Sequence, residues 1–139
     1  MILFVCTGNT CRSPMAECIY KAITGKEAQS AGIAANPGMA ASPNAVAVMK
    51  EKGYDLGHIS RQVNNDMLDE ADTVITLTVN HANLLKKAAP EFSEKIISLY
   101  EWAGKKGDVL DPYGGDINIY RACAEEIEEL INEGQKIHG

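Results

Sequence analysis

The chain lacks a long hydrophobic run, which excludes a membrane-spanning helix, because such a helix needs about 20 consecutive apolar residues. Its first residues, MILFVCTG, also lack the basic segment and the longer apolar stretch of a secretory signal peptide. We therefore expect a cytoplasmic protein with no membrane partner. Permanent disulfides are rare in that reducing compartment, so each of the four cysteines needs a catalytic, redox or packing role.

Positive charge is scarce as well. Lysine and arginine together number 13 and aspartate and glutamate 19, which gives a net charge of −6. Proteins that bind nucleic acid usually carry a basic excess, so we expect no nucleic-acid partner. A site for a small anion stays compatible with this composition, because local hydrogen-bond donors can outweigh a weak overall field.

Internal repeats, linkers and low-complexity tracts are also missing. A chain of 139 residues is long enough for one domain with its own core and too short for two. Hydrophobic residues make up 45% of the chain, which is enough to fill that core. We expect a single domain over residues 1–139, acting as a monomer.

What the chain does contain is an alternation of strand and helix patterns. Short apolar or β-branched runs predict strands at residues 2–5, 27–33 (a more polar edge strand), 71–78 and 95–100. Periodic stretches between and after them predict helices from Ser13, from Ser42 to Gly53, at residues 80–92 and at about 118–136. This order predicts a doubly wound α/β fold, a parallel sheet with helices on both faces.

Two of these helices begin with a Ser-Pro pair. Ser13 and Ser42 are predicted N-caps, and Pro14 and Pro43 suit the first helical position. The buried stripe of the first helix is predicted to contain Met15, Cys18, Ile19, Ala22 and Ile23. That of the last helix is predicted to contain Tyr120, Cys123, Ala124, Ile127, Leu130 and Ile131.

Between the first strand and the first helix the chain reads VCTGNTCRSPMAE, residues 5–17. Cys6 and Arg12 stand in the spacing C-x5-R, and the segment between them is small and polar. In doubly wound folds ligands bind beyond the carboxyl ends of the strands, which is where this segment lies. The position and the composition together predict a site for a phosphate group.

The spacing has a physical explanation. The backbone N–H groups of residues 7–12 can converge on one anion in a nest that continues into a helix N-terminus. Gly8 is expected to supply backbone angles that other residues avoid, and Asn9 to tolerate a left-handed conformation while its amide ties the loop. Arg12 can offer a planar fork to two phosphate oxygens. The loop thus predicts a binding site for a phosphoryl dianion.

Cys6 lies at the base of this nest. A positive field stabilises a thiolate, and Ser13 can donate a further hydrogen bond to the sulfur. A thiolate that faces a bound phosphorus atom is a nucleophile, so the sequence predicts covalent phosphoryl transfer to Cys6.

A non-enzymatic alternative exists. Flavodoxins hold the phosphate of a flavin in a loop resembling T-x-T-G-N-T, and Thr7, Gly8, Asn9 and Thr10 fit its last four positions. The first threonine is replaced by Val5, however, and a flavin clamp needs neither a cysteine nor an arginine.

The segment resembles the phosphate loop of the low-molecular-weight protein tyrosine phosphatase family, most closely its protein arginine phosphatase branch. The resemblance extends to SAGI (residues 30–33), HISRQ (58–62), ADTVITLT (71–78) and DVLDPYGGDINIY (108–120). It implies a flavodoxin-like fold with a four-stranded parallel sheet, a cysteinyl-phosphate intermediate, phosphorylated proteins as substrates, and no metal or other cofactor. It also implies that Asp111, in the Asp-Pro dipeptide, is the general acid and later the general base.

Thr10 bears on the choice between phosphoarginine and phosphotyrosine. The resemblance implies isoleucine here in tyrosine phosphatases and threonine in arginine phosphatases, and a hydroxyl can accept a hydrogen bond from a guanidinium N–H. Ala35 is the expected counterpart of an aromatic wall residue in tyrosine phosphatases. Tyr113 can stack on either substrate and so does not discriminate. We expect phosphoarginine, with phosphotyrosine as the alternative.

The remaining cysteines have separate interpretations. Cys11 could form a reversible disulfide with Cys6 or simply fill the loop. Cys18 and Cys123 are predicted to pack in the core. No cysteine lies between them, which disfavours an arsenate reductase that relays electrons through a later cysteine pair, and no spacing suggests a zinc site.

A few further side chains are candidates for a role. The three histidines, His58, His81 and His138, look isolated and are expected to be surface or structural residues. For Arg61 the sequence leaves two alternatives, substrate binding and simple exposure to solvent. Trp102 is expected to pack in the core.

Overall fold

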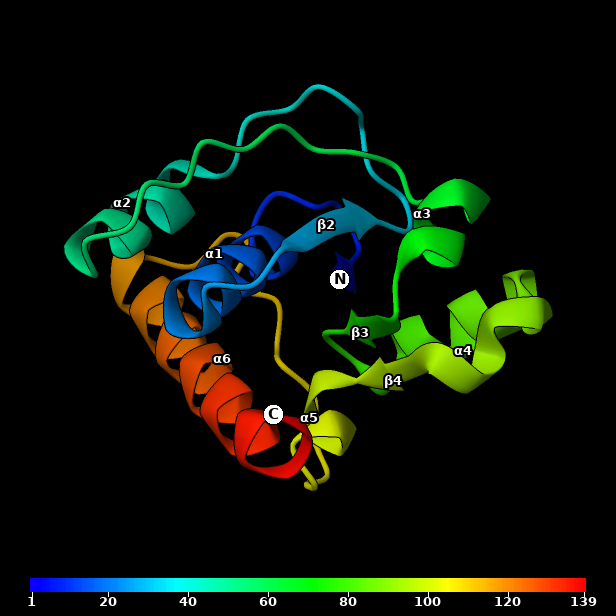
Figure 1. Cartoon of the computed structure of the whole chain (residues 1–139). Coiled ribbons are helices and arrows are strands. Elements are labelled where there is room, and N and C mark those ends of the chain that lie inside the picture. Colours follow the sequence, from blue (N-terminus) through cyan, green and yellow to red (C-terminus); the bar gives the residue numbers. More distant parts are fainter.

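A four-stranded parallel sheet, in the order β2-β1-β3-β4, forms the centre of the computed structural model, which describes residues 1–139 (Figure 1). The strands are β1 (Ile2–Cys6), β2 (Ala28–Gly32), β3 (Thr73–Thr76) and β4 (Ile96–Ser98). The helices are α1 (Arg12–Thr24), α2 (Pro43–Glu51), α3 (Asn65–Glu70), α4 (Val79–Ala88), α5 (Leu99–Trp102) and α6 (Ile117–His138), with a 3-10 helix η1 (Pro90–Lys95). The predicted doubly wound α/β fold is confirmed, including β2 as an edge strand.

Helices cover both faces of the sheet, and the alternation of side chains along β1 shows how. Phe4 and Cys6 belong to the apolar cluster that β1 shares with α1, α2, α5 and α6. Leu3 and Val5 belong to a second cluster, on the side of α3 and α4. Because both faces of β1 are buried, its sequence is a continuous apolar run instead of an alternating one.

The order of the strands creates a crevice at the carboxyl end of β1. From β1 the chain passes through α1 to β2 on one side, and it later returns to β3 on the other side of β1. The loops that follow β1 and β3 therefore leave the sheet in different directions, which is the usual ligand position in doubly wound folds. The segment VCTGNTCRSPMAE starts at this point.

The last helix, α6, is the long amphipathic element that covers one face. All six residues of its predicted apolar stripe are buried. It packs on α1, α2 and α5. Where it meets α5, Gly134 lies against the ring of the buried Trp102, so the two helices approach more closely than a side chain at position 134 would permit.

Several predicted boundaries were wrong. The helix predicted at residues 80–92 is two elements, α4 and η1, because Pro90 begins a new turn. The strand predicted at residues 95–100 ends at Ser98, whose side chain caps the short helix α5 by accepting from Glu101 N. The helices α3 and α5 were not predicted at all.

The start of the first helix also differs from the prediction. Ser13 is not the N-cap, because the helix already begins at Arg12, and Pro14 is its third residue. The Ser13 hydroxyl is buried and faces Cys6 instead of an N–H group of its own helix. Of the predicted stripe, Ala22 and Ile23 are exposed. Ser42, in contrast, caps α2 as predicted, by accepting from Ala45 N.

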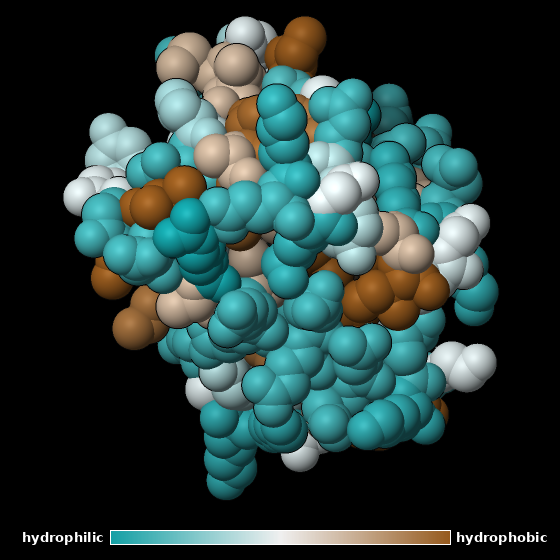
Figure 2. All heavy atoms as spheres, turned by 90° about the vertical axis from the view of Figure 1, so that its left-hand side faces the viewer, coloured by the Kyte–Doolittle hydropathy of each residue, from teal (hydrophilic) through white to brown (hydrophobic).

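The face that Figure 2 shows is mostly hydrophilic, and its hydrophobic side chains lie in several separate groups. Such scattered apolar side chains are ordinary on a protein surface. None of the helices is at once long enough and apolar enough to pass through a bilayer.

The contact between α5 and α6 generates a prediction. Gly134→Ala should lower the free energy of unfolding by about 1–2 kcal/mol, because the overlap of the new Cβ with the buried Trp102 ring outweighs the better helix propensity of alanine. Urea denaturation measures the change. Gly57→Ala is the matched control, since its Cβ would meet nothing within 4 Å and its φ is not positive. Equal stability of the two variants would contradict the predicted overlap.

Candidate active site

The loop of residues 7–11 joins the last residue of β1, Cys6, to the first residue of α1, Arg12. Both of these residues are buried, with 3% and 5% of their surface exposed. The backbone N–H groups from Thr7 to Cys11 donate to no acceptor of the protein. Five consecutive free donors beside a buried cysteine and a buried arginine form a nest for an anion.

Asn9 holds this loop in shape. It is fully buried and is the only non-glycine residue with a positive φ, at 57°. Its Nδ2 donates to Ser13 Oγ at 2.9 Å and to Ser30 Oγ of β2 at 3.0 Å, and its Oδ1 accepts from Arg61 N at 2.9 Å. The prediction for Asn9 is confirmed. The one for Gly8 was wrong, because Gly8 does not have a positive φ and the left-handed residue is Asn9.

The sulfur of Cys6 lies 2.9 Å from the hydroxyl oxygen of Ser13. Because the same hydroxyl oxygen accepts a hydrogen bond from Asn9 Nδ2, its own proton is free to point to the sulfur. The three side chains thus form a relay that ends in a donor to Cys6. A donor at this position stabilises the thiolate, as the sequence predicted for Ser13.

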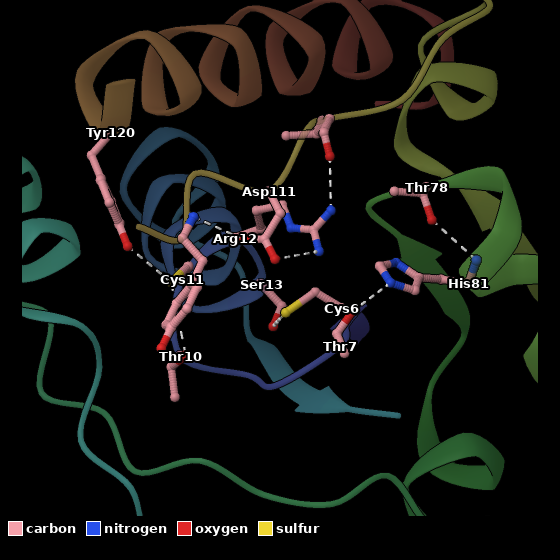
Figure 3. A network of polar contacts seen from close by, with 12 residues as sticks. Cys6, Thr7, Thr10, Cys11, Arg12, Ser13, Thr78, His81, Asp111 and Tyr120 are labelled. Atoms are coloured by element: carbon pink, nitrogen blue, oxygen red, sulfur yellow. Dashed lines mark hydrogen bonds and ion pairs between the residues drawn. The ribbon is translucent and has the colours of Figure 1, made fainter. Parts of the chain in front are cut away.

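The guanidinium of Arg12 is held by the segment of residues 109–111 (Figure 3). Its Nη1 donates to the carbonyl oxygen of Val109 at 2.8 Å, and its Nη2 lies 3.7 Å from Asp111 Oδ2. The Asp111 side chain is 52% exposed, whereas that of Arg12 is 6% exposed. The arginine is therefore fixed in the protein, and the carboxylate lies at the mouth of the cleft.

A cleft of about 200 Å³ lies between these groups. It is lined by Cys6, Thr7, Gly8, Thr10, Cys11, Arg12, Asp111 and Tyr113. All of these are residues that the sequence predicted, and Tyr113, at the rim, is 80% exposed. Ala35, the expected wall position, does not line the cleft; its N–H donates to Gln62 Oε1 outside it.

Other contacts of the loop were missed by the sequence. His58 Nε2 bonds to the Asn9 carbonyl oxygen at 2.8 Å, and His81 Nε2 lies 2.9 Å from Thr7 Oγ1. The expectation that these two histidines are isolated was therefore wrong. Arg61 is neither a cleft residue nor free in solvent, since its guanidinium donates to the carbonyl oxygen of Ser30. These partners are far from the loop in sequence, so no local pattern could have identified them.

Comparison with known proteins identifies the family. Residues 1–135 match the family model described as low molecular weight phosphotyrosine protein phosphatase. The chain belongs to this family. No group of three or more His, Cys, Asp or Glu side chains in the phosphatase is placed to hold a metal ion.

Two relatives of the phosphatase are named protein-arginine-phosphatase. One, from Bacillus subtilis (strain 168), is 41% identical over 138 residues, covering 95% of this chain and 92% of the relative. The other, from Geobacillus stearothermophilus, is 43% identical over 134 residues, covering 94% and 90%. A solved structure of the arginine phosphatase YwlE, a cysteine-to-serine mutant with a phosphorylated active-site serine, has a TM-score of 0.94 and 38% identity and covers 99% of this chain and 95% of that one.

The other cysteines of the phosphatase have different surroundings. Burial, assisted by the charge of Glu126, raises the pKa of Cys123 to about 12, and burial together with Glu17 raises that of Cys18 to about 11. Both therefore remain thiols near neutral pH and are poor nucleophiles. Cys123 is buried as predicted, whereas Cys18 is only partly buried.

Cys11 is buried and also lines the cleft. Its Sγ lies 3.4 Å from the hydroxyl of Tyr120 on α6. Burial, with this contact, raises the pKa of Tyr120 to about 12, so the tyrosine remains a neutral phenol. All four cysteines are free thiols in the structure, and the disulfide between Cys6 and Cys11 stays a prediction.

The role of Asn9 can be tested with two substitutions. Asn9→Gly and Asn9→Ala both remove the three side-chain hydrogen bonds, so both should lose at least tenfold in kcat/KM, because the loop and the Ser13 hydroxyl are no longer fixed. Asn9→Ala should in addition be about 1 kcal/mol less stable than Asn9→Gly, since alanine disfavours a left-handed backbone. Turnover of p-nitrophenyl phosphate and urea denaturation provide the two measurements. Full activity of Asn9→Gly would show that the amide is not needed.

Proposed function

We propose that the chain removes phosphate from phosphoarginine side chains of proteins through a phosphoryl group carried on Cys6. The observation that supports this most is the convergence of Cys6, Arg12 and Asp111 on one cleft, beside five backbone N–H groups without acceptors. The names of the two relatives, at 41% and 43% identity over nearly the whole chain, support phosphoarginine as the substrate.

In the first step the Cys6 thiolate attacks the phosphorus atom, and the bond from phosphorus to the guanidinium nitrogen breaks. The free N–H groups of the loop and the Arg12 guanidinium hold the phosphoryl oxygens while charge develops on them. Asp111, in its protonated form, gives its proton to the leaving nitrogen. This proton matters greatly, because an unprotonated guanidine anion is a very poor leaving group.

In the second step water hydrolyses the cysteinyl-phosphate. The Asp111 carboxylate accepts a proton from the water as the oxygen attacks phosphorus, and the sulfur leaves as a thiolate. The Ser13 hydroxyl, 2.9 Å from the sulfur, stabilises that thiolate both before attack and after departure. Inorganic phosphate then leaves the loop and restores the starting state.

The surroundings of Thr10 favour arginine over tyrosine. Thr10 lines the cleft, and its hydroxyl has one polar contact, with Cys11 Sγ at 3.8 Å. This contact is too long for a strong hydrogen bond, so the hydroxyl is free to accept from a substrate N–H. A guanidinium has such N–H groups to offer and a phenyl ring does not. The alternative substrate is phosphotyrosine, for which the exposed ring of Tyr113 offers a stacking surface.

The test is to compare kcat/KM for a phosphoarginine peptide and a phosphotyrosine peptide of otherwise identical sequence. The proposal predicts faster turnover of phosphoarginine. A preference for phosphotyrosine would assign the chain to the alternative. The purified protein should be colourless, whereas bound yellow flavin would support the flavin-binding alternative. It should show no thiol-dependent turnover of arsenate, whereas such turnover would support the arsenate reductase alternative.

Asp111→Asn should slow the first step without preventing phosphate binding. An amide cannot donate the proton that the leaving nitrogen needs, so phosphoarginine turnover should fall by about 100-fold or more. An aryl phosphate with a good leaving group needs that proton less and should be slowed much less. Single-turnover measurements with both substrates test this. Equal slowing of the two would remove Asp111 from the role of general acid.

Thr10→Ile should shift the preference from phosphoarginine to phosphotyrosine. Both side chains are β-branched, so the backbone preference of the loop is retained. Loss of the hydroxyl leaves a guanidinium donor unpaired, at a cost of roughly 1–3 kcal/mol, and the added apolar surface favours an aryl ring by at most about 1 kcal/mol. The ratio of the two kcat/KM values should change by about tenfold to several hundredfold. Thr10→Ser is the control that keeps the hydroxyl and should keep the preference.

We infer further that the enzyme works in the cytoplasm as a monomer.

We also infer that Cys11 protects Cys6 by forming a disulfide with it under oxidising conditions. In this structure Cys6 contacts Ser13 and Cys11 contacts Tyr120, so a disulfide requires both sulfurs to leave these partners. Mass spectrometry after peroxide treatment should find the Cys6–Cys11 link and not only sulfinic or sulfonic acid at Cys6.

A further inference from the structure

His81 is a buried titratable residue that the mechanism above does not use. It is the third residue of α4, which follows β3, and 7% of its surface is exposed. Its Nε2 lies 2.9 Å from Thr7 Oγ1, so the contact joins the phosphate loop after β1 to the first turn of α4 (Figure 3). Its other ring nitrogen, Nδ1, is buried and has no hydrogen-bond partner. The ring therefore has a single polar contact, and that contact is with the loop.

The surroundings of His81 keep the ring neutral. Burial lowers the pKa of His81, and so does the nearby charge of Arg12. Asp108 and Asp111 act in the opposite direction but do not outweigh these effects. The position of the ring in the first turn of α4 also disfavours a positive charge. A neutral imidazole carries one N–H, so the ring can donate from only one of its two nitrogens.

The contacts decide which nitrogen carries the hydrogen. A hydrogen on Nδ1 would be a buried donor without an acceptor, and such orphaned donors are rarer in proteins than acceptors that lack a partner. The unpartnered Nδ1 therefore favours a hydrogen on Nε2, with Thr7 Oγ1 as its acceptor at 2.9 Å. A hydroxyl oxygen that accepts from one side keeps its own proton free to donate elsewhere.

The free proton of Thr7 lies at the cleft. The Thr7 side chain is exposed, and it lines the cleft together with Cys6, Arg12 and Asp111. We propose that His81 is a positioning residue: it donates to Thr7 Oγ1 and thereby directs the Thr7 hydroxyl proton to an oxygen of the phosphoryl group. This role rests on the phosphatase activity proposed above and adds a side-chain donor to the backbone nest.

Ser13, beside the Cys6 sulfur, has a similar arrangement of hydrogen bonds. There, Asn9 donates to the Ser13 hydroxyl, whose proton is left for Cys6. In both cases a buried side chain fills the acceptor side of a hydroxyl and so turns the hydroxyl into a donor to the reacting groups. One relay serves the nucleophile and the other serves the anion.

The tautomer of His81 provides the first test. In 15N-labelled protein, NMR of the imidazole nitrogens should show the neutral form with the hydrogen on Nε2, both without ligand and with saturating inorganic phosphate. An imidazole with its hydrogen on Nδ1 would make the Thr7 hydroxyl a donor to the ring and would overturn the proposal. A protonated imidazole near neutral pH would overturn it as well.

A double-mutant cycle provides the second test, with inorganic phosphate as the ligand and 1H-15N shifts as the readout. Thr7→Val should weaken phosphate binding by about tenfold or more, the usual effect of losing a hydrogen bond to a charged group, and Thr7→Ser should stay within about twofold of the wild type. His81→Ala should weaken binding about three- to tenfold in the wild type but not in the Thr7→Val background, because the two residues act through one hydroxyl. Asn83→Ala, an exposed change on the same helix, is the control and should bind normally.

Two results would overturn the role of His81: unchanged phosphate binding in Thr7→Val, or equal weakening by His81→Ala in both backgrounds, which marks a purely structural residue. If His81→Ala fails to fold, the tautomer and the Thr7 variants still decide. Neither readout uses a leaving group. An enzyme that bound phosphate as described but did not hydrolyse phosphoarginine would therefore contradict the proposed substrate and not this inference.

Discussion

The geometry of the phosphate loop depends on the buried side chain of Asn9. With a left-handed backbone and hydrogen bonds to Ser13, to Ser30 and to the backbone of Arg61, it fixes the loop against β2 and α1. A residue other than glycine costs free energy in a left-handed backbone conformation, and a buried side-chain amide without hydrogen-bond partners would cost more. The conformation of Asn9 therefore persists only with all its hydrogen-bond partners in place. The orientation of the Ser13 hydroxyl to Cys6 follows from the same bonds.

The types of the longer elements were predictable from the sequence, whereas the short helices α3 and α5 and several element ends were not. The apolar run of β1 and the stripe of α6 are long or uniform enough to reveal burial. The stretch from Lys95 to Tyr100 shows where this fails. Its β-branched and aromatic residues favour a strand, yet β4 pairs with β3 over three residues only, and the Ser98 side chain then starts a helix. Tertiary pairing sets that limit, and local propensity does not contain it.

In the site as well, residues that are close together in the sequence could be predicted, and contacts between distant residues could not. Cys6, Arg12 and Asn9 were found because the loop gathers them within seven residues, at a strand end where ligands bind. The contact of Ser13 with the sulfur was predicted correctly. The predicted helix cap was wrong, because Ser-Pro is a common helix start and the sequence does not reveal where a hydroxyl points. The contact of His81 could not be predicted, because its partner Thr7 lies 74 positions away in the chain.

One segment, residues 109–111, holds the guanidinium of Arg12 and carries Asp111. Val109 accepts from Arg12 and donates to the carbonyl oxygen of Leu77 after β3, which anchors the segment two residues before Asp111. The Asp111 carboxylate lies 3.7 Å from the guanidinium. A phosphoryl dianion bound in the loop would compete with that carboxylate for the same cation. In the proposed mechanism, one segment therefore places both the group that holds the phosphoryl oxygens and the group that gives up the proton.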